Sequence, residues 1–188
     1  MQHATPGTYI GLLRGINVGG KHILPMKDLA AIMAGCGARD VRTYIQSGNV
    51  VFRAGADTAR KLPALAAKAV ANQFGFDAPV VILSARELAE AAAGNPFPQA
   101  DTYGMGFLRD KPAPALLAKL DPDRSPPDRF VVRGRIIYLQ LPNGAARTKL
   151  TAPYFDAALN TVSTFRNWRT VLKLLELTRK GQGSVPGV

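Results

Sequence analysis

The feature that most constrains the fold of this 188-residue chain is an order of apolar segments that occurs twice. In each half, β-prone runs and helical stripes follow one another as strand, helix, strand, strand, helix, strand and helix. The predicted strands cover residues 9–13, 41–45, 50–52, 80–83, 103–108, 129–132, 136–141 and 161–165. The predicted helices begin near Pro25, Thr58, Ala85, Ala113, Pro153 and Asn167. The repeat predicts two halves of similar design.

A βαββαβ unit is the ferredoxin-like split motif, in which helices cover one face of an antiparallel sheet. We therefore predict an α+β protein of two tandem ferredoxin-like halves, residues 1–94 and 95–180. The turn-rich residues 94–98 join the halves, and the Gly- and Pro-rich tail, residues 181–188, is expected to be disordered. Asp57 and Thr151 are expected to cap the helices that follow them, and Ser84 with Glu87 to form a capping box.

The composition restricts the class of protein and its partners. With 47% hydrophobic and 20% charged residues, the chain has enough apolar surface to fold. No apolar run is long enough to span a membrane, and a lone Cys36 forms no internal disulfide, so we predict a cytoplasmic protein without a membrane partner. The two histidines and the cysteine form no ligand set, so neither a metal nor a cofactor is predicted. The net charge of +11 favours anionic partners.

Residues 14–21 contain a glycine loop of the kind that holds phosphate. Gly15, Gly20 and Lys21 match the phosphate-loop spacing, but His22 replaces the Ser or Thr that binds magnesium. Two further residues then separate the loop from the next helix, which argues against a nucleotide triphosphatase. An anion site remains, and its expected members are Arg14, Asn17, Gly19, Gly20 and Lys21. The alternative is that the glycines only let the chain leave the strand.

A polar turn separates the second and third strands of the first half. Its Gln46, Ser47 and Asn49 are candidates for orienting a ligand, Gln46 most of all. Turn residues of this kind also satisfy their own backbone, which is the alternative for Ser47 and its neighbours.

The second half carries most of the positive charge. Residues 129–180 contain ten Lys and Arg against two acids, a net charge of +8. Arg147 and Lys149 precede a helix, where cations are unfavourable unless an anion joins them. Arg166, Asn167 and Arg169 surround the only tryptophan, Trp168, which is expected in the core although it could stack a base. These five polar residues complete the candidate site.

Five blocks of the sequence resemble a widespread bacterial family catalogued as domain-of-unknown-function family 1697. They stand in order as LLRGINVGGK (12–21), VRTYIQSGNVVF (41–52), NPFP (95–98), RTKL (147–150) and FRNWRTVLKL (165–174). Family members more often have Ser at position 148 and Thr at position 165, where this chain has Thr and Phe. The resemblance implies paired ferredoxin-like halves. The family has no established activity, so no catalytic residue is carried over.

The leading hypothesis is an anion-binding protein whose ligand is a nucleic acid or a phosphate-bearing nucleotide. The polar blocks would form one site between the two halves, with Lys and Arg on the phosphate and amides orienting the ligand. An enzyme of small phosphorylated or carboxylated substrates is the first alternative, although no general base is evident. A structural protein whose polar blocks hold the halves together is the second. The sequence leaves the oligomeric state open.

Overall fold

The computed structural model describes residues 6–101 and 103–180, so the predicted disorder of residues 181–188 lies outside the described part of the chain. The chain divides into two compact units: unit 1 runs to Ala89 and resumes at Lys173, and unit 2 runs from Glu90 to Leu172. The expected halves met at residues 94 and 95 and kept residues 173–180 in the second half, whereas this stretch belongs to unit 1. The two similar halves expected from the repeat are present.

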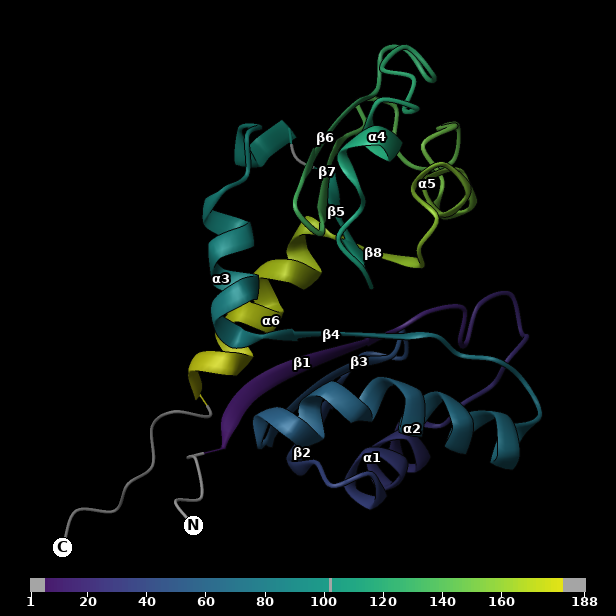
Figure 1. Cartoon of the computed structure of the whole chain (residues 1–188), viewed down its shortest axis with the longest axis vertical. Helices are drawn as coiled ribbons and strands as arrows, with labels where there is room; N and C mark the ends of the chain where they lie inside the picture. Colours follow the sequence, from purple (N-terminus) through teal and green to yellow (C-terminus); the bar gives the residue numbers. More distant parts are fainter. Residues whose placement is uncertain (1–5, 102, 181–188) are drawn as a thin grey trace, which may run out of the picture. The chain divides into compact units, whose positions relative to one another are not determined.

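Unit 1 contains one four-stranded antiparallel sheet with the strand order β2-β3-β1-β4 (Figure 1). Its strands are β1 (Gly7–Leu13), β2 (Arg39–Tyr44), β3 (Asn49–Ala54) and β4 (Val80–Ser84). Its helices are α1 (Met26–Gly35) and α2 (Ala56–Phe74), and α3 (Ala85–Ala93) starts here directly after β4.

Unit 2 repeats this design with the strand order β6-β7-β5-β8, also antiparallel. Its strands are β5 (Gly104–Leu108), β6 (Arg129–Arg133), β7 (Ile136–Gln140) and β8 (Ser163–Asn167). Its helices are the 3-10 turn η1 (Gln99–Asp101), α4 (Pro114–Leu117) and α5 (Ala152–Leu159). The last helix, α6 (Trp168–Lys180), begins in unit 2 and ends in unit 1.

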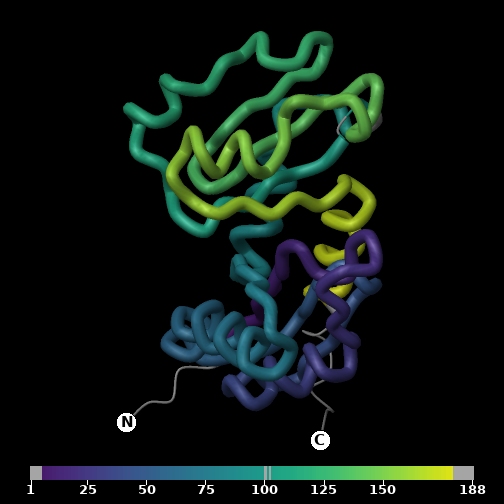
Figure 2. Tube along the Cα trace, turned by 90° about the vertical axis from the view of Figure 1, so that its right-hand side faces the viewer, coloured from purple at the N-terminus to yellow at the C-terminus, as the bar shows by residue number. Residues whose placement is uncertain are grey.

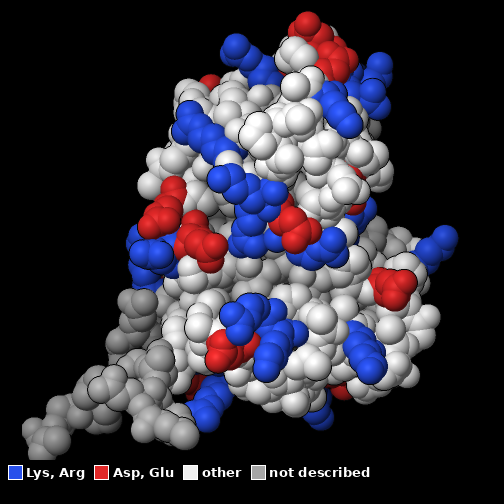
Figure 3. Space-filling model, in the orientation of Figure 1, with Lys and Arg blue, Asp and Glu red and all other residues white. Residues whose placement is uncertain are grey.

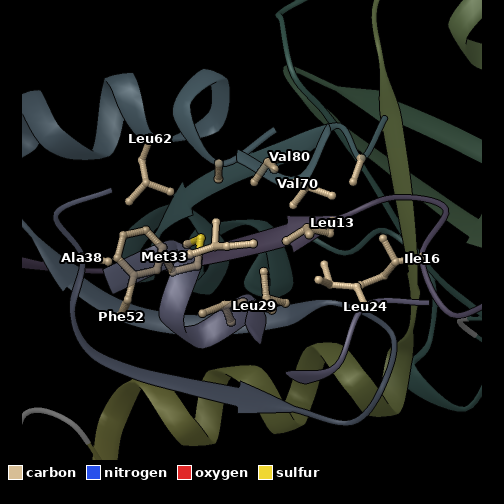
Figure 4. Close-up of a cluster of buried hydrophobic side chains, with 14 of the residues drawn as sticks. Leu13, Ile16, Leu24, Leu29, Met33, Ala38, Phe52, Leu62, Val70 and Val80 are labelled. Carbon is tan, nitrogen blue, oxygen red and sulfur yellow. The ribbon is translucent and has the colours of Figure 1, made fainter. Parts of the chain in front are cut away.

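The principal core of unit 1 fills the space between its sheet and helices α1 and α2. Figure 4 shows Leu13 and Phe52 of the sheet pointing toward Leu29 and Met33 of α1 and Leu62 of α2. These five side chains are at most 1% exposed. Burying such a side chain stabilises the fold by about 1.5–3 kcal/mol. Apolar residues at alternating strand positions therefore hold α1 and α2 on one face.

The opposite face of this sheet is also apolar, which differs from the expected covering of one face. Its buried members are Ile10, Leu12, Val51, Val81 and Leu83. Residues 173–180 of α6 lie on this side, where Leu177 lines a small hollow together with Val51 (Figure 1). Leu174 is fully buried. Since the central strands β1 and β3 carry apolar residues on both faces, one helical layer cannot bury them, and the chain returns to supply a second.

The core of unit 2 is built around Phe155 of α5, which is fully buried. Its ring lies 5.4 Å from that of Phe130 and 5.8 Å from that of Phe165. The Phe165 ring also covers Gly106, its partner in register on β5. A Cβ at position 106 would overlap this ring, so the glycine makes room for the aromatic side chain.

The end of α3 belongs to unit 2 and is held there by two hydrogen bonds. Tyr138 donates its hydroxyl to the carbonyl of Ala91 at 2.8 Å, and Arg133 donates to the carbonyl of Gly94 at 2.7 Å. Both acceptors lie at the carboxyl end of the helix, where carbonyls lack partners within the helix. Both bonds therefore lie within unit 2, to which the end of α3 belongs.

The predicted helix cap is present at α3 and differs at α2. Ser84 and Glu87 form the predicted capping box, with Ser84 N donating to Glu87 Oε2 at 2.7 Å and Glu87 N donating to Ser84 Oγ at 3.1 Å. The prediction for Asp57 is wrong, because α2 starts two residues earlier, at Ala56, with Gly55 at the cap. Asp57 instead pairs with Arg60 on the first turn. Thr151 takes the cap position of α5 but makes no side-chain capping bond.

Substitution of Gly106 by alanine is expected to lower the free energy of unfolding by about 1–3 kcal/mol, because the added methyl overlaps the Phe165 ring. In a Phe165→Thr background the same substitution should cost much less. Urea denaturation of the four proteins measures this coupling. An equal cost in both backgrounds would show that the ring is not the obstacle.

Substitution of Tyr138 by phenylalanine is expected to cost about 1 kcal/mol at pH 7, because the Ala91 carbonyl loses its donor. Burial raises the pKa of Tyr138 above its usual 10.0. A pKa that is higher in the folded state means that the phenol contributes fully at neutral pH, and that this contribution is lost as the pH rises through the folded value. The stability difference between the two proteins should therefore narrow above pH 10, as thermal unfolding across this range would show.

Candidate functional site

The glycine loop after β1 folds into a tight hairpin of its own. Lys21 N donates to Val18 O at 3.1 Å, and Asn17 N donates to His22 O at 3.1 Å. Gly19 and Gly20 form the turn with φ of 58° and 72°, the left-handed values that glycine adopts without strain. This geometry favours the conformational interpretation of the two glycines over a phosphate loop that runs into a helix.

Asn17 joins this loop to the turn between β2 and β3. Its Nδ2 donates to the carbonyls of Leu24 at 2.9 Å and Gln46 at 2.8 Å, while its Oδ1 accepts from Leu24 N at 2.8 Å. The two segments consequently lie side by side at one end of the sheet (Figure 2). The predicted site residues of unit 1 are thus gathered at this end, and the amide of Asn17 is used within the scaffold.

The turn between β2 and β3 is held by Gly48 and Asn49. Gly48 has a φ of 75°, and a Cβ there would approach Leu13 and Ile16 within 3 Å, so no other residue fits. Asn49 is fully buried and donates to Tyr44 O at 3.1 Å and to Ser47 Oγ at 2.8 Å. Gln46 is the exposed polar residue of this turn whose side chain makes no hydrogen bond among the described residues.

Two predicted cations of unit 1 differ in their surroundings. Arg14 is half-buried, and its backbone N–H donates to Pro79 O at 3.0 Å. Lys21 is exposed beside the glycine turn, and its ammonium forms no ion pair within residues 6–101 and 103–180. Lys21 is therefore the cation of this loop that is available to an anion.

The predicted cations on the loop before α5 are also exposed. Lys149 uses its backbone N–H to reach Ser125 Oγ at 3.0 Å, which fixes the loop and leaves the ammonium in solvent. The Arg147 side chain makes no ion pair or hydrogen bond in the described part of the chain. Ser125 in turn donates to the buried Asp128 at 2.7 Å.

Arg166 occupies a different environment, on the face of the β8 strand that also carries Thr164. Its Nη1 donates to Thr164 Oγ1 and to Phe165 O, each at 2.8 Å. Burial lowers the pKa of its guanidinium to about 10, which leaves it charged at neutral pH. A buried cation that hydrogen-bonds its own strand serves the packing of unit 2 rather than an open surface.

A pocket of about 660 Å³ lies in unit 2 at the beginning of α6. Its walls come from three segments that meet because β5 starts where β7 and β8 end. They comprise Asp101, Tyr103, Gln140, Leu141, Pro142, Asn167, Trp168 and Arg169. Asn167 Oδ1 accepts from Thr170 N at 2.8 Å and so caps the helix, while Arg169 is exposed without an ion pair among the described residues.

Trp168 is in the core, as the sequence predicted, with 8% of its surface exposed. Its indole N–H is buried and has no hydrogen-bond partner in the described part of the chain. An unmade bond of this kind costs about 1–3 kcal/mol.

A second hollow, of about 880 Å³, shares Asp101 and Gln140 with the first. Its lining is rich in proline and includes Asp123 and Asp128 against a single cation, Arg129. This charge balance is unsuited to an anion. The basic side chains of the protein are likewise interspersed with acidic ones on the face shown in Figure 3, so individual unpaired cations, rather than a uniform patch, define the candidate site.

Some of the candidate residues consequently gather in two groups, one in each unit. Arg14, Asn17, Lys21 and the turn between β2 and β3 meet in unit 1. Asn167 and Arg169 meet in the pocket of unit 2, which Arg147 and Lys149 do not line. Tyr103, Gln140 and Asp101 line this pocket and were not predicted. The antiparallel strand order was the available signal, because it brings the start of the first strand to the ends of the third and fourth.

The protein is thus an α+β chain of two similar units with candidate polar clusters at strand ends. Residues 7–138 match the family described as a protein of unknown function (DUF1697), and the chain belongs to this family. The fold is similar to that of the conserved bacterial protein SP0830 from Streptococcus pneumoniae, with a TM-score of 0.67 and 22% sequence identity over 92% of this chain and 99% of that one. A comparison with curated proteins finds no match.

The described residues include no helix with the length and apolar character needed to cross a membrane. Residues 6–101 and 103–180 also contain no group of three or more His, Cys, Asp or Glu side chains that could hold a metal ion.

Substitution of Asn17 by alanine is expected to lower the free energy of unfolding by about 2–4 kcal/mol, because three hydrogen bonds are lost and alanine strains the left-handed φ of 54°. Asn17→Gly removes the same bonds without that strain and should recover about 1 kcal/mol. Chemical denaturation distinguishes the two variants. Wild-type stability in both would contradict a scaffold role for this amide.

Proposed function

We propose that the protein binds a phosphate-bearing polyanion, either a nucleic acid strand or a nucleotide. The cations that would contact phosphate are Lys21, Arg147, Lys149 and Arg169. Arg14 and Arg166 stay in the proposed set as less exposed cations. Glycines 19 and 20 and Ser47 shape the loops around them, and Gln46 offers a free amide.

The observation that supports this proposal is the pairing of the acids. Both acidic residues between positions 129 and 180 are already engaged within their own units. Asp156 accepts from Ser163 N at 2.8 Å, and Glu176 pairs with Lys173 at 2.8 Å. Arg147, Lys149 and Arg169 are exposed without an ion pair among the described residues. Exposed cations without internal partners release counterions when they meet phosphates, which is the main source of affinity for nucleic acids.

The position of Arg169 adds a second electrostatic argument. It stands in the first turn of a 13-residue helix, where the helix dipole is positive and a cation is unfavourable. An anion at this end would interact favourably with both the guanidinium and the dipole. A negatively charged ligand would therefore offset the unfavourable placement of Arg169 at the start of the helix.

A structural role is the second candidate, and it is favoured for part of the set. The side chains of Asn17 and Asn49 donate to backbone and hydroxyl groups of their own unit. We also assign the ferredoxin-like arrangement to each unit, since the orders β2-β3-β1-β4 and β6-β7-β5-β8 both place the first strand between the third and fourth. On this assignment, Asn17 and Asn49 belong to the scaffold that positions the cations.

Replacing Lys149 and Arg169 together by alanine is expected to weaken binding of a labelled single-stranded oligonucleotide. The slope of log K against log salt should become shallower by about 0.7 for each lost phosphate contact. Fluorescence anisotropy between 50 and roughly 200 mM salt measures this slope.

The matched control is the double variant Lys27→Ala and Lys119→Ala, which loses the same charge from exposed positions outside the proposed site. It should leave the slope unchanged. An equal change of slope in both double variants would show that the effect comes from the net charge alone. The proposal would be contradicted if the wild type showed no salt-dependent binding.

A further inference from the structure

The pocket at the start of α6 has a lining that distinguishes one kind of occupant from another. At about 660 Å³ it has the size of sites that hold small molecules. Asp101 and Arg169 line the same pocket, so its charges are of both signs. A phosphate filling the pocket would be repelled by the carboxylate. A neutral group with amino hydrogens would instead find an acceptor there.

Flat and apolar walls form part of the same pocket. Tyr103 lines this pocket and is 37% exposed, so part of its surface is open to an occupant. Leu141, Pro142 and Trp168 complete the apolar lining. Aromatic side chains bind nucleobases by stacking, and this stacking is worth about 1–3 kcal/mol for each base.

The remaining lining residues supply hydrogen-bonding groups. Asn167 uses its Oδ1 for the helix cap, which leaves its amide N–H groups without a partner among the described residues. The Gln140 amide is likewise unused within residues 6–101 and 103–180, and it stands at the end of β7. Side-chain amides and carboxylates are the groups that recognise the edges of bases.

We infer that this pocket receives a single unpaired nucleobase of a nucleic acid strand, with Arg169 on the adjoining phosphate. The inference rests on the proposed function and names its ligand more closely. Tyr103 provides the stacking surface, and Asp101 accepts from an exocyclic amino group. Trp168 lies in the same wall, and its indole N–H is the one buried side-chain donor or acceptor without a hydrogen-bond partner in the described part of the chain.

The inference predicts a preference for single strands over duplex. In a duplex the base faces are stacked and the edges are paired, so no base can enter a pocket without being extruded. Phosphate contacts alone would not make this distinction, because both forms of nucleic acid carry them. Strand preference therefore separates recognition of a base from attraction by charge.

The test titrates the full-length protein at low salt with a labelled single-stranded deoxyadenosine oligonucleotide and with a duplex of the same length. The expected result is at least tenfold tighter binding of the single strand. The emission of Trp168, the only tryptophan, should change on binding of the single strand alone. Tyr103→Ala should weaken single-strand binding about tenfold and leave duplex binding unchanged.

Tyr103→Phe is the matched control, because it keeps the stacking ring and should retain wild-type affinity. Circular dichroism verifies that each variant is folded. Equal binding of single strand and duplex, or an unaffected Tyr103→Ala variant, would overturn the base pocket while leaving salt-dependent polyanion binding in place. No binding of either nucleic acid would remove the nucleic-acid form of the proposed function as well.

Discussion

The requirement that both faces of each sheet be buried determines the rest of the architecture. In β3 and β5 almost every residue is buried, so these strands need apolar cover on two sides. The local helices α1 and α2 supply one cover in unit 1. The other comes from the end of α6, a helix that starts in unit 2. In unit 2, the end of α3 docks on Tyr138 and Arg133. Each unit thus receives a helical segment that the other unit began.

The elements of this fold could be predicted because their signals are local. Alternating or continuous apolar runs marked the strands, and Ser84 with Glu87 marked the start of α3. The sheet against which the end of α6 packs could not be predicted in this way. An amphipathic stripe shows that a helix has a partner but carries no information about which sheet it meets. Asp57 was misplaced for a related reason, because a cap depends on where the backbone leaves its extended conformation, here at Gly55.

The candidate site could be predicted in its residue types more than in its geometry. Polar residues at strand ends could be identified in the sequence. The residue type does not, however, distinguish an amide that binds a ligand from one that hydrogen-bonds within the scaffold. Asn17 belongs to the second kind, since its three hydrogen bonds stay within unit 1. Tyr103 was missed because one aromatic residue before a strand has no distinctive pattern. It becomes conspicuous only when antiparallel pairing brings it beside Asn167 and Arg169.

The division of α6 between the two units has a consequence for synthesis on the ribosome. Most of unit 1 is translated before unit 2, but the residues from Lys173 onward, whose Leu177 lies beside Val51, emerge only after unit 2. One apolar face of the unit 1 sheet therefore stays exposed until unit 2 has been synthesised. Exposed strands of this kind are vulnerable to aggregation and to chaperone capture. A nascent chain arrested before α6 should consequently expose that face, whereas release of the final helix would close it.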